Sequence, residues 1–322
     1  MPTPCAALGY AMGTEIDVVI VSWNVAELLR GCLATLTMPE TAALVGQVIV
    51  VDNASSDETL TMLAREYPQV KVLPNRENLG FTRANNQALA LTSAPYILLL
   101  NPDTLLKEDA LLLMLDALRA QPQVAVVGPR LVYGDGSPQP SRRRFPTLAM
   151  ALAESTPVEW HLPNNPASQR YRMADIPDDR AQLVDWVTGA CMLVRRAAME
   201  QVGVFDERFF MYSEELDWCK RFTDSGWQVA YQPDAMVVHL EGASSSQASA
   251  ARLVRFNTSK VLYHIKHHGR LRGETIRLAL LGVFASEWLL EAAKWMLGHK
   301  RELRASRMRA YGGVLRSGLR HV

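Results

Sequence analysis

Polar side chains that directly follow apolar segments are the first candidates for chemistry in this chain. Three apolar segments end in such a group, and the residues concerned are Ser22 and Asn24, Asp52 and Asn53, and Asn101 and Asp103. If these segments are parallel strands, their carboxyl ends lie along one edge of the sheet, where ligands of such sheets bind. We therefore expect these residues to line one crevice.

A crevice of this composition would need a cation in order to hold a diphosphate. The chain has no G-x-G-x-x-G after its first apolar segment and no G-x-x-x-x-G-K-[ST] sequence, so no glycine loop cradles phosphates. Divalent cations bound to phosphates typically take one or two protein carboxylates, and Asp103 is suited to that role. The alternative is that Asn101, Pro102 and Asp103 only cap the following helix.

A second group of acids lies in the sequence SEELDW. In a helix, Glu214 and Asp217 would share one side, with Glu215 about 100° away. A carboxylate here could act as a general base that takes a proton from an attacking hydroxyl. Acids in a first turn also suit the helix dipole, so an ordinary acidic helix start is the alternative.

The elements that must position these residues alternate regularly over the first half of the chain. Apolar segments at 16–24, 47–53, 70–74, 96–101 and 124–128 alternate with helical patterns at 26–37, 55–68, 82–92 and 107–122. This alternation predicts βαβ units, a parallel sheet and the α/β class.

Composition and charge limit the remaining choices. The chain of 322 residues can bury one large core, or one core with an appendage. Its four cysteines show no metal-ligand spacing and the N-terminus shows no secretion signal, so we expect reduced thiols in the cytosol. Residues 251–322 hold 15 Lys or Arg against 4 Asp or Glu, so a basic tail follows an acidic body. This asymmetry favours work at an anionic surface.

Several motifs, taken in order, resemble family 2 glycosyltransferases, and most of all the bacterial rhamnosyltransferase-type members. They are VVIVSWN, VIVVDNASSDET, NLGFTRANNQAL, YILLLNPDT, GACMLVRRAAMEQVGVFDERFFMYSEELDWCKR and VVHLEG, and they span about residues 16–246. The resemblance implies a GT-A fold, a Rossmann-like nucleotide-binding sheet flanked by helices. It also implies a nucleoside diphosphate sugar as donor and Mg²⁺ or Mn²⁺ as cofactor.

The resemblance implies roles for individual residues. Asp103 would bind the metal, while Asn101 replaces the first acid of the family's DXD motif and would at most contact the ribose. His239 would bind the metal or the diphosphate. Glu215, or else Glu214, would be the base. The expected nucleotide-sugar contacts are Ser22, Asn24, Asp52, Asn53, Gly80, and Asn85 or Asn86.

The segment 133–182 is rich in Pro, Gly and polar residues and has no sustained period, which predicts a long loop over the crevice. Acceptor contacts are expected from Arg142, Arg143 and Arg144 in this loop, from Trp186, and from Asp217 and Trp218. A solvated run of arginines and a tryptophan in the core are the alternatives.

The tail after residue 250 has helical composition but only nine consecutive uncharged residues, too few to span a bilayer. Glu287, Glu291 and Lys294 would form a polar stripe, and Trp288 and Trp295 another face. This pattern favours helices lying on an anionic membrane; packing on the catalytic domain or a homodimer contact is the alternative. His264, His267 and His268 are expected to face solvent or membrane.

Together these observations predict an inverting, metal-dependent glycosyltransferase. Residues 1–250 would form the catalytic domain, with a donor half at about 15–132 and an acceptor half at about 133–250, and residues 251–322 a basic helical extension. The acceptor would be a glycan or a polyprenyl-linked precursor of the cell surface, and the enzyme would be cytoplasmic and peripheral on the membrane. A nucleotidyltransferase and a non-catalytic nucleotide-sugar-binding adaptor are the alternatives, and nucleic acid is not expected as a partner.

Overall fold

The computed structural model describes residues 14–320, apart from 155, 157, 158, 160, 161, 163, 164 and 241–248. The N-terminal segment in which we expected no secretion signal, with Cys5, lies outside the described residues. So do residues 241–248, which follow His239 and Leu240.

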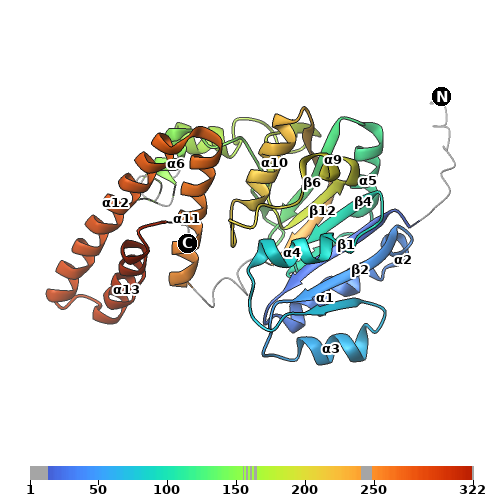
Figure 1. The fold of residues 1–322 in the computed structure, drawn as a ribbon, viewed down its shortest axis with the longest axis horizontal. Coiled ribbons are helices and arrows are strands. Elements are labelled where there is room, and N and C mark those ends of the chain that lie inside the picture. The colour runs from blue at the N-terminus through green and yellow to red at the C-terminus, as the bar shows by residue number, and fades with distance from the viewer. Residues whose placement is uncertain are drawn as a thin grey trace.

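The first half of the chain forms the expected βαβ units (Figure 1). Strands β3, β2, β1 and β4 pair in that order, and all three pairings are parallel. Ser22 and Asp52 are register partners at the ends of β1 and β2. The elements are β1 (Ile16–Ser22), α1 (Ala26–Leu36), α2 (Pro39–Ala42), β2 (Val45–Asp52), α3 (Thr59–Glu66), β3 (Lys71–Pro74), α4 (Phe81–Leu89) and β4 (Tyr96–Leu100).

The sheet as a whole is mixed, which corrects the prediction of a parallel sheet. β11 (Cys191–Arg195) enters between β4 and β6 and runs antiparallel to both. Beyond it, β12 pairs in parallel with β6 and antiparallel with the short β5. Besides β11, this part of the fold contains β5 (Thr104–Leu106), α5 (Ala110–Ala120), β6 (Val124–Val132), β9 (Gln182–Val184), α9 (Arg196–Val202), α10 (Glu214–Asp224) and β12 (Gln228–His239).

The two faces of the sheet bury two separate cores, because side chains alternate along each strand. Val19, Ile49 and Leu99 belong to the core that also holds residues of α4 and α10. Ile20 and Leu98 belong to the opposite core, with residues of α1 and α5. Helices on both faces therefore fix the strand ends, and with them the crevice.

The segment 133–182 is not a structureless loop, and the prediction was wrong on this point. It contains β7 (Pro138–Gln139), β8 (Arg142–Arg143), α6 (Leu148–Ala153) and α8 (Pro166–Tyr171), and β8 pairs with β10 (Trp186–Val187). Thr147 caps α6 and Asn165 caps α8, each accepting a hydrogen bond from a backbone N–H three residues on. These caps, with Pro166 at the start of α8, are the sequence signals that should have predicted the helices.

The C-terminal region forms three helices, α11 (Ser249–His268), α12 (Arg270–Met296) and α13 (Arg301–Ser317), beside the catalytic sheet (Figure 1). They share a small core that includes Ile276, Phe284 and Val314, and α12 also contacts α6. Within the described ranges no helix is long and apolar enough to cross a bilayer.

Two expectations for the tail were wrong. His264 is fully buried and does not face solvent, although His268 is exposed. Glu291 is buried as well, where it forms ion pairs with Arg304 (2.8 Å) and Arg307 (3.4 Å) of α13 instead of joining an exposed polar stripe. The helix pattern was correct, but the pairing of α12 with α13 could not be predicted from either segment alone.

Candidate active site

The ends of β1 and β2 hold two buried polar atoms that have no partner among the described residues. They are the Ser22 Oγ and the Asp52 Oδ1, and both residues are at least 99% buried. The other oxygen of Asp52 accepts a hydrogen bond from the backbone N–H of Ser55. An unpartnered buried polar atom costs roughly 1–3 kcal/mol, so this pair is suited to a ligand that restores the hydrogen bonds.

Asn24 and Asn53, two other expected nucleotide contacts, shape the loops around this place. The Asn24 Oδ1 accepts a hydrogen bond from the Ser56 N–H (2.7 Å). The Asn53 amide donates to Asn78 (3.0 Å) and to the Gly80 carbonyl (3.2 Å). Their side chains therefore hold the loops after β2 and β3 in place.

Gly80, Asn85 and Asn86 make contacts within the protein, and their roles as nucleotide contacts remain predictions. A Cβ on Gly80 would lie 2.6 Å from the Phe210 carbonyl oxygen, so the close approach is to the chain before α10. Asn85 donates to Phe81 in its own helix, and Asn86 donates to the carbonyl of Phe205. These residues brace the segment that precedes the Glu214–Glu215 helix.

Asp103 and His239 come together at the expected place. β12 pairs with β5 so that His239 lies opposite Thr104, and the His239 Nε2 is 3.3 Å from an Asp103 carboxylate oxygen. The other ring nitrogen of His239 contacts the Gln139 side chain (2.9 Å), and a hydrogen bond of this kind fixes the orientation of the imidazole ring. In the described part of the chain no group of three or more potential ligands forms a complete metal site. One carboxylate and one imidazole fit an ion whose remaining ligands come from a diphosphate.

Glu215 is connected to the region of Asp103 and His239 by contacts of the segment before β11. The Asn101 N–H donates to the Ala190 carbonyl (2.8 Å), which places the segment before β11 beside the Asn101-Pro102-Asp103 turn. The neighbouring Gly189 lies against the Glu215 side chain, since a Cβ on Gly189 would be 3.6 Å from the Glu215 Cβ. The structure thus brings the candidate base and the candidate metal ligand to the same end of the sheet.

Of the two candidate bases, Glu215 is the one that lines a cavity. Glu215 is half-buried and borders a cavity of about 170 Å³, whereas Glu214 is buried and does not border it. Burial raises the pKa of both carboxyl groups, and for Glu214 the charge of Glu215 adds to the rise. Tyr212 and Ser213, just before α10, both have positive φ values (71° and 64°), a strained backbone typical of functional sites.

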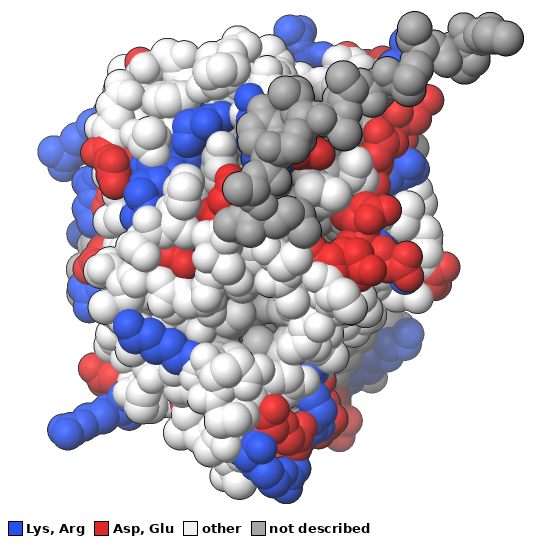
Figure 2. Space-filling model, turned by 90° about the vertical axis from the view of Figure 1, so that its right-hand side faces the viewer, with Lys and Arg blue, Asp and Glu red and all other residues white. Residues whose placement is uncertain are grey.

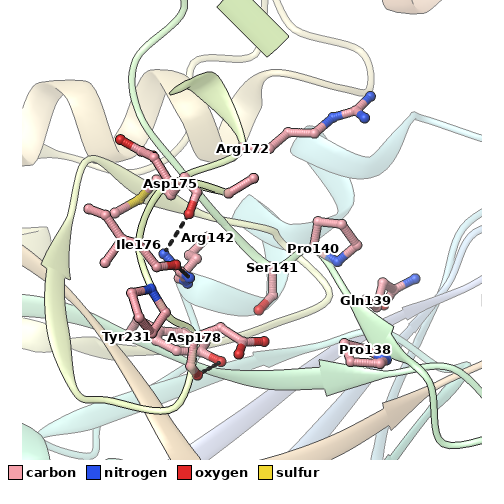
Figure 3. Close-up of a pocket in the computed structure, with 13 residues that line it drawn as sticks. Pro138, Gln139, Pro140, Ser141, Arg142, Arg172, Asp175, Ile176, Asp178 and Tyr231 are labelled. Carbon is pink, nitrogen blue, oxygen red and sulfur yellow. Dashed lines mark hydrogen bonds between the residues drawn. The ribbon is translucent and has the colours of Figure 1, made fainter. Parts of the chain in front are cut away.

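The three consecutive arginines differ in what they contact. The Arg142 guanidinium donates hydrogen bonds to the Ile176 carbonyl (2.7 Å) and to the Gln182 side chain (3.2 Å). Arg142 and Ile176 line a surface hollow (Figure 3). Arg144 pairs with Asp175 (3.1 Å). Arg143 forms no ion pair with any carboxylate of the described residues, and burial lowers the pKa of its guanidinium.

Arg143 separates two cavities. On one side is the Glu215 cavity, the 170 Å³ space bordered by Glu215; on the other is the His239 cavity, about 340 Å³, bordered by His239 and Thr188. The Arg143 guanidinium lies 5.9 Å from the ring centre of Trp186, which borders the Glu215 cavity. Of the expected acceptor residues, Arg143 therefore borders both the Glu215 cavity and the His239 cavity, and Trp186 borders the Glu215 cavity.

Asp217 and Trp218 do not reach this space, so their prediction as acceptor contacts is corrected. Asp217 is fully buried and pairs with Lys266 and His267 of α11, each at 2.7 Å. Trp218 packs in the core, and its ring N–H donates to the Gly203 carbonyl. The two-residue spacing between Glu215 and Asp217 places the two acids on opposite sides of α10.

Sequence reasoning missed the contribution of α11 to this region. Phe256, Lys260, Tyr263 and His264 all border the Glu215 cavity, although they belong to the segment treated as a tail. Their spacing of three or four residues places them on one helix face, but the same spacing also describes an ordinary core-facing stripe. Only the packing of α11 against α10 distinguishes the two.

The mixed sheet with helices on both faces has the architecture of a GT-A glycosyltransferase, and its strand ends carry a carboxylate beside a histidine. The chain belongs to glycosyl transferase family 2, whose family model matches residues 17–203. This membership confirms the resemblance found in the sequence and favours glycosyl transfer over the nucleotidyltransferase and adaptor alternatives.

Curated relatives place the chain near rhamnosyltransferases. It is 30% identical over 286 residues to an N-acetylglucosaminyl-diphospho-decaprenol L-rhamnosyltransferase of Mycobacterium tuberculosis, covering 85% of this chain and 92% of the relative. It is 27% identical over 234 residues to the rhamnosyltransferase WbbL of Escherichia coli K12, covering 70% and 83% of the two chains.

Among solved structures, the chain is similar in fold to the mannosyltransferase PcManGT of Pyrobaculum calidifontis in complex with GDP-Man and Mn²⁺. That match has a TM-score of 0.54 at 17% identity and covers 95% of this chain and 87% of the other. GalNAc-T7, solved with UDP, GalNAc and Mn²⁺, matches with a TM-score of 0.55 at 15% identity over 70% of this chain and 42% of its own. Both support the GT-A fold.

Proposed function

We propose that this chain is an inverting, divalent-metal-dependent rhamnosyltransferase whose acceptor is a sugar linked to a polyprenyl diphosphate. The observation that supports the proposal is that Asp103 lies 3.3 Å from His239, while Glu215 packs against Gly189, next to the Ala190 carbonyl that accepts a hydrogen bond from Asn101. The proposed donor and acceptor classes are those of the mycobacterial relative, an N-acetylglucosaminyl-diphospho-decaprenol L-rhamnosyltransferase.

In the proposed reaction, the acceptor hydroxyl oxygen forms a bond with the anomeric carbon of the donor sugar. The bond from that carbon to the diphosphate breaks at the same time, and its electron pair leaves with the nucleoside diphosphate. Glu215 takes the hydroxyl proton, so one carboxylate suffices as base. Asp103 and His239 would hold Mg²⁺ or Mn²⁺, which supplies positive charge to the departing diphosphate.

The buried Ser22 and Asp52 oxygens would receive the nucleobase of the donor, whose N–H groups can restore the missing hydrogen bonds. Asp52 accepts only one backbone N–H from the protein, so one oxygen remains for the ligand. A base that offers an N–H beside a carbonyl, as uracil and thymine do, suits this hydroxyl and carboxylate pair.

We further propose that the exposed face of α12 docks on an anionic membrane, where a polyprenyl-linked acceptor resides. No exposed position of α12 between residues 275 and 293 carries a charge, and Leu278 and Leu289 are 61% and 63% exposed. Trp295, Met296 and Leu297 continue the apolar surface at the end of α12, and the exposed cations Lys294, Lys300 and Arg301 flank it. An apolar face bordered by cations is typical of membrane-interface helices.

The opposite end of the molecule differs in character. Figure 2 shows that end, where Lys and Arg occur together with Asp and Glu over the part that the grey atoms do not cover. A surface of mixed charge is typical of contact with solvent. The proposed orientation therefore places this end toward solvent and the three C-terminal helices toward the lipid.

A substrate panel tests the proposed reaction. Purified full-length protein is incubated with Mn²⁺, a synthetic N-acetylglucosaminyl-diphospho-lipid and a set of nucleoside diphosphate sugars. We expect transfer from a nucleoside diphosphate rhamnose, with inversion at the anomeric carbon. Transfer from another sugar would correct the donor, and no transfer from any donor in the panel would contradict the proposal.

A further inference from the structure

The Glu215 cavity lies between the catalytic domain and the C-terminal helices. Its walls come from the start of α10, from α6, α8 and β10, and from α11. The helix α11 lies outside the family-matched residues 17–203, so this chain completes the cavity with a segment that the family model does not include.

Unpartnered polar atoms point to a ligand in this cavity. Both ring nitrogens of His264, the hydroxyl of Tyr263 and one carboxylate oxygen of Glu215 are buried without hydrogen-bond partners among the described residues. Burial lowers the pKa of His264 to about 3, so the imidazole is neutral near pH 7 and offers one donor and one acceptor. A neutral, hydroxyl-rich ligand would satisfy these groups, whereas an apolar ligand would leave them unpaired.

The other walls carry aromatic rings and two cations. Tyr171, Trp186, Tyr212 and Phe256 supply ring surfaces, and Lys260 is neutralised by its ion pair with Glu154 (3.0 Å). Arg143 forms no ion pair with a carboxylate in the described part of the chain, and it borders the His239 cavity as well. Apolar walls with a few placed polar groups are typical of small-molecule sites, and a volume of about 170 Å³ suits one sugar ring.

We propose that this cavity holds the acceptor's sugar ring, that Phe256 and His264 of α11 select it, and that Arg143 binds its anomeric phosphate. The inference rests on the proposed function, because Glu215 is the base toward which the acceptor hydroxyl points. The C-terminal region then has a second role besides membrane contact, since it completes the acceptor site.

The test compares variants on two faces of α11. Phe256→Ala and His264→Ala alter the cavity, whereas Thr258→Ala, the matched control, changes a residue that borders a different cavity on the far side of the helix. Each full-length protein is assayed for the acceptor KM and for donor hydrolysis without acceptor, and its thermal unfolding is recorded.

We expect Phe256→Ala and His264→Ala to raise the acceptor KM at least tenfold. Donor hydrolysis in both variants should stay within twofold of wild type. Thr258→Ala should change neither quantity. His264→Gln, which keeps a donor and an acceptor, should recover part of the loss. An unchanged acceptor KM in both cavity variants would overturn the inference. The inference would also be overturned if both variants lost donor hydrolysis and thermal stability together with acceptor binding.

A second comparison tests the role of Arg143 separately. Arg143→Gln should weaken the diphospho-lipid acceptor but not an uncharged methyl glycoside of the same sugar. If the variant instead raises the donor KM, Arg143 binds the donor diphosphate and the phosphate assignment is wrong. Failure of the proposed function is distinguishable, because the wild-type protein would then transfer no sugar to either acceptor.

Discussion

Asp103 and His239 lie far apart in the chain and meet because β5 pairs with β12. The position of Asp103 after an apolar segment predicted its role, whereas the role of His239 came from the family resemblance, and their placement at 3.3 Å fits a shared ion. A diphosphate beside carboxylate-bearing strand ends requires positive charge, and the sequence has no glycine-rich phosphate-binding motif to hold it.

We predict that nucleoside diphosphate binding requires Mn²⁺ or Mg²⁺ and that Asp103→Asn weakens it at least tenfold while the fold remains intact. The amide keeps the size of the side chain but lacks the charge that holds the ion. Titration calorimetry with Mn²⁺ and with EDTA measures the difference. Equal affinity in the two buffers for the wild-type protein would show that no metal takes part.

The arginine triplet shows where residue-level prediction ends. Arg142, Arg143 and Arg144 look alike in sequence, and all three were expected to contact the acceptor. Whether each finds a partner depends on carbonyls and carboxylates brought close by the fold, as with Ile176 for Arg142 and Asp175 for Arg144. The same holds for Asn86, which was expected to contact the nucleotide sugar and donates a hydrogen bond to the Phe205 carbonyl.

At the scale of elements, hydrophobic periodicity predicted the parallel half of the sheet and most of its helices. It could not predict the direction of β11, because a buried strand has the same apolar pattern whichever way it runs. The pairing of α11 with α10 was also missed. It depends on Asp217, whose buried charge looked like part of an acidic helix start but forms ion pairs with Lys266 and His267.

This ionic contact between α10 and α11 gives a prediction with a defined pH dependence. Burial by itself raises the pKa of Asp217, but its hydrogen bonds with His267 and Lys266 and the charge of Arg221 outweigh it, and the net pKa is lowered. A lowered folded-state pKa gives stability that is present above the unfolded value of about 3.9 and lost as the pH falls below it.

Asp217→Asn should therefore destabilise the protein by roughly 3 kcal/mol at pH 7, the lower end of the range for breaking a buried pair. Urea unfolding at pH 7 and at pH 3 measures both values, with the His268→Asn protein, changed at an exposed position of α11, as control. The difference between wild type and Asp217→Asn should shrink at pH 3. A difference that is the same at both pH values would show that the ionic contact does not stabilise the fold.

At the scale of the whole molecule, the three C-terminal helices connect the acceptor side of the active site with an apolar outer surface. The division of the chain at residue 250 remains a prediction, since α11 packs against both the catalytic domain and α12. The net charge of +1 conceals the basic character of this region, which only its separate count of charges revealed.

We predict that the full-length protein floats with vesicles containing anionic lipid at low salt and is released as salt rises. Each Lys or Arg near such a surface contributes about 1 kcal/mol, and screening shortens the field to about 8 Å at physiological ionic strength. Leu278→Glu with Leu289→Glu should abolish flotation, because both leucines lie on the exposed α12 face.

Leu60→Glu, at an exposed position of α3 in the catalytic domain, is the matched control and should float like wild type. If the wild-type protein ignores anionic vesicles but sediments as a dimer that the double variant disrupts, the α12 face is a contact between two copies. The membrane proposal would then be wrong.

The central claim is that Glu215 is the base of a sugar transfer, and kcat for the two glutamate variants tests it most directly. Glu215→Gln should lower kcat about 10²–10⁴-fold, the usual contribution of a general base, with donor affinity nearly unchanged. Glu214→Gln, at the neighbouring carboxylate that does not border the cavity, should keep most of the activity. A large loss in Glu214→Gln alone would move the base by one residue. Full activity in both variants would contradict the account.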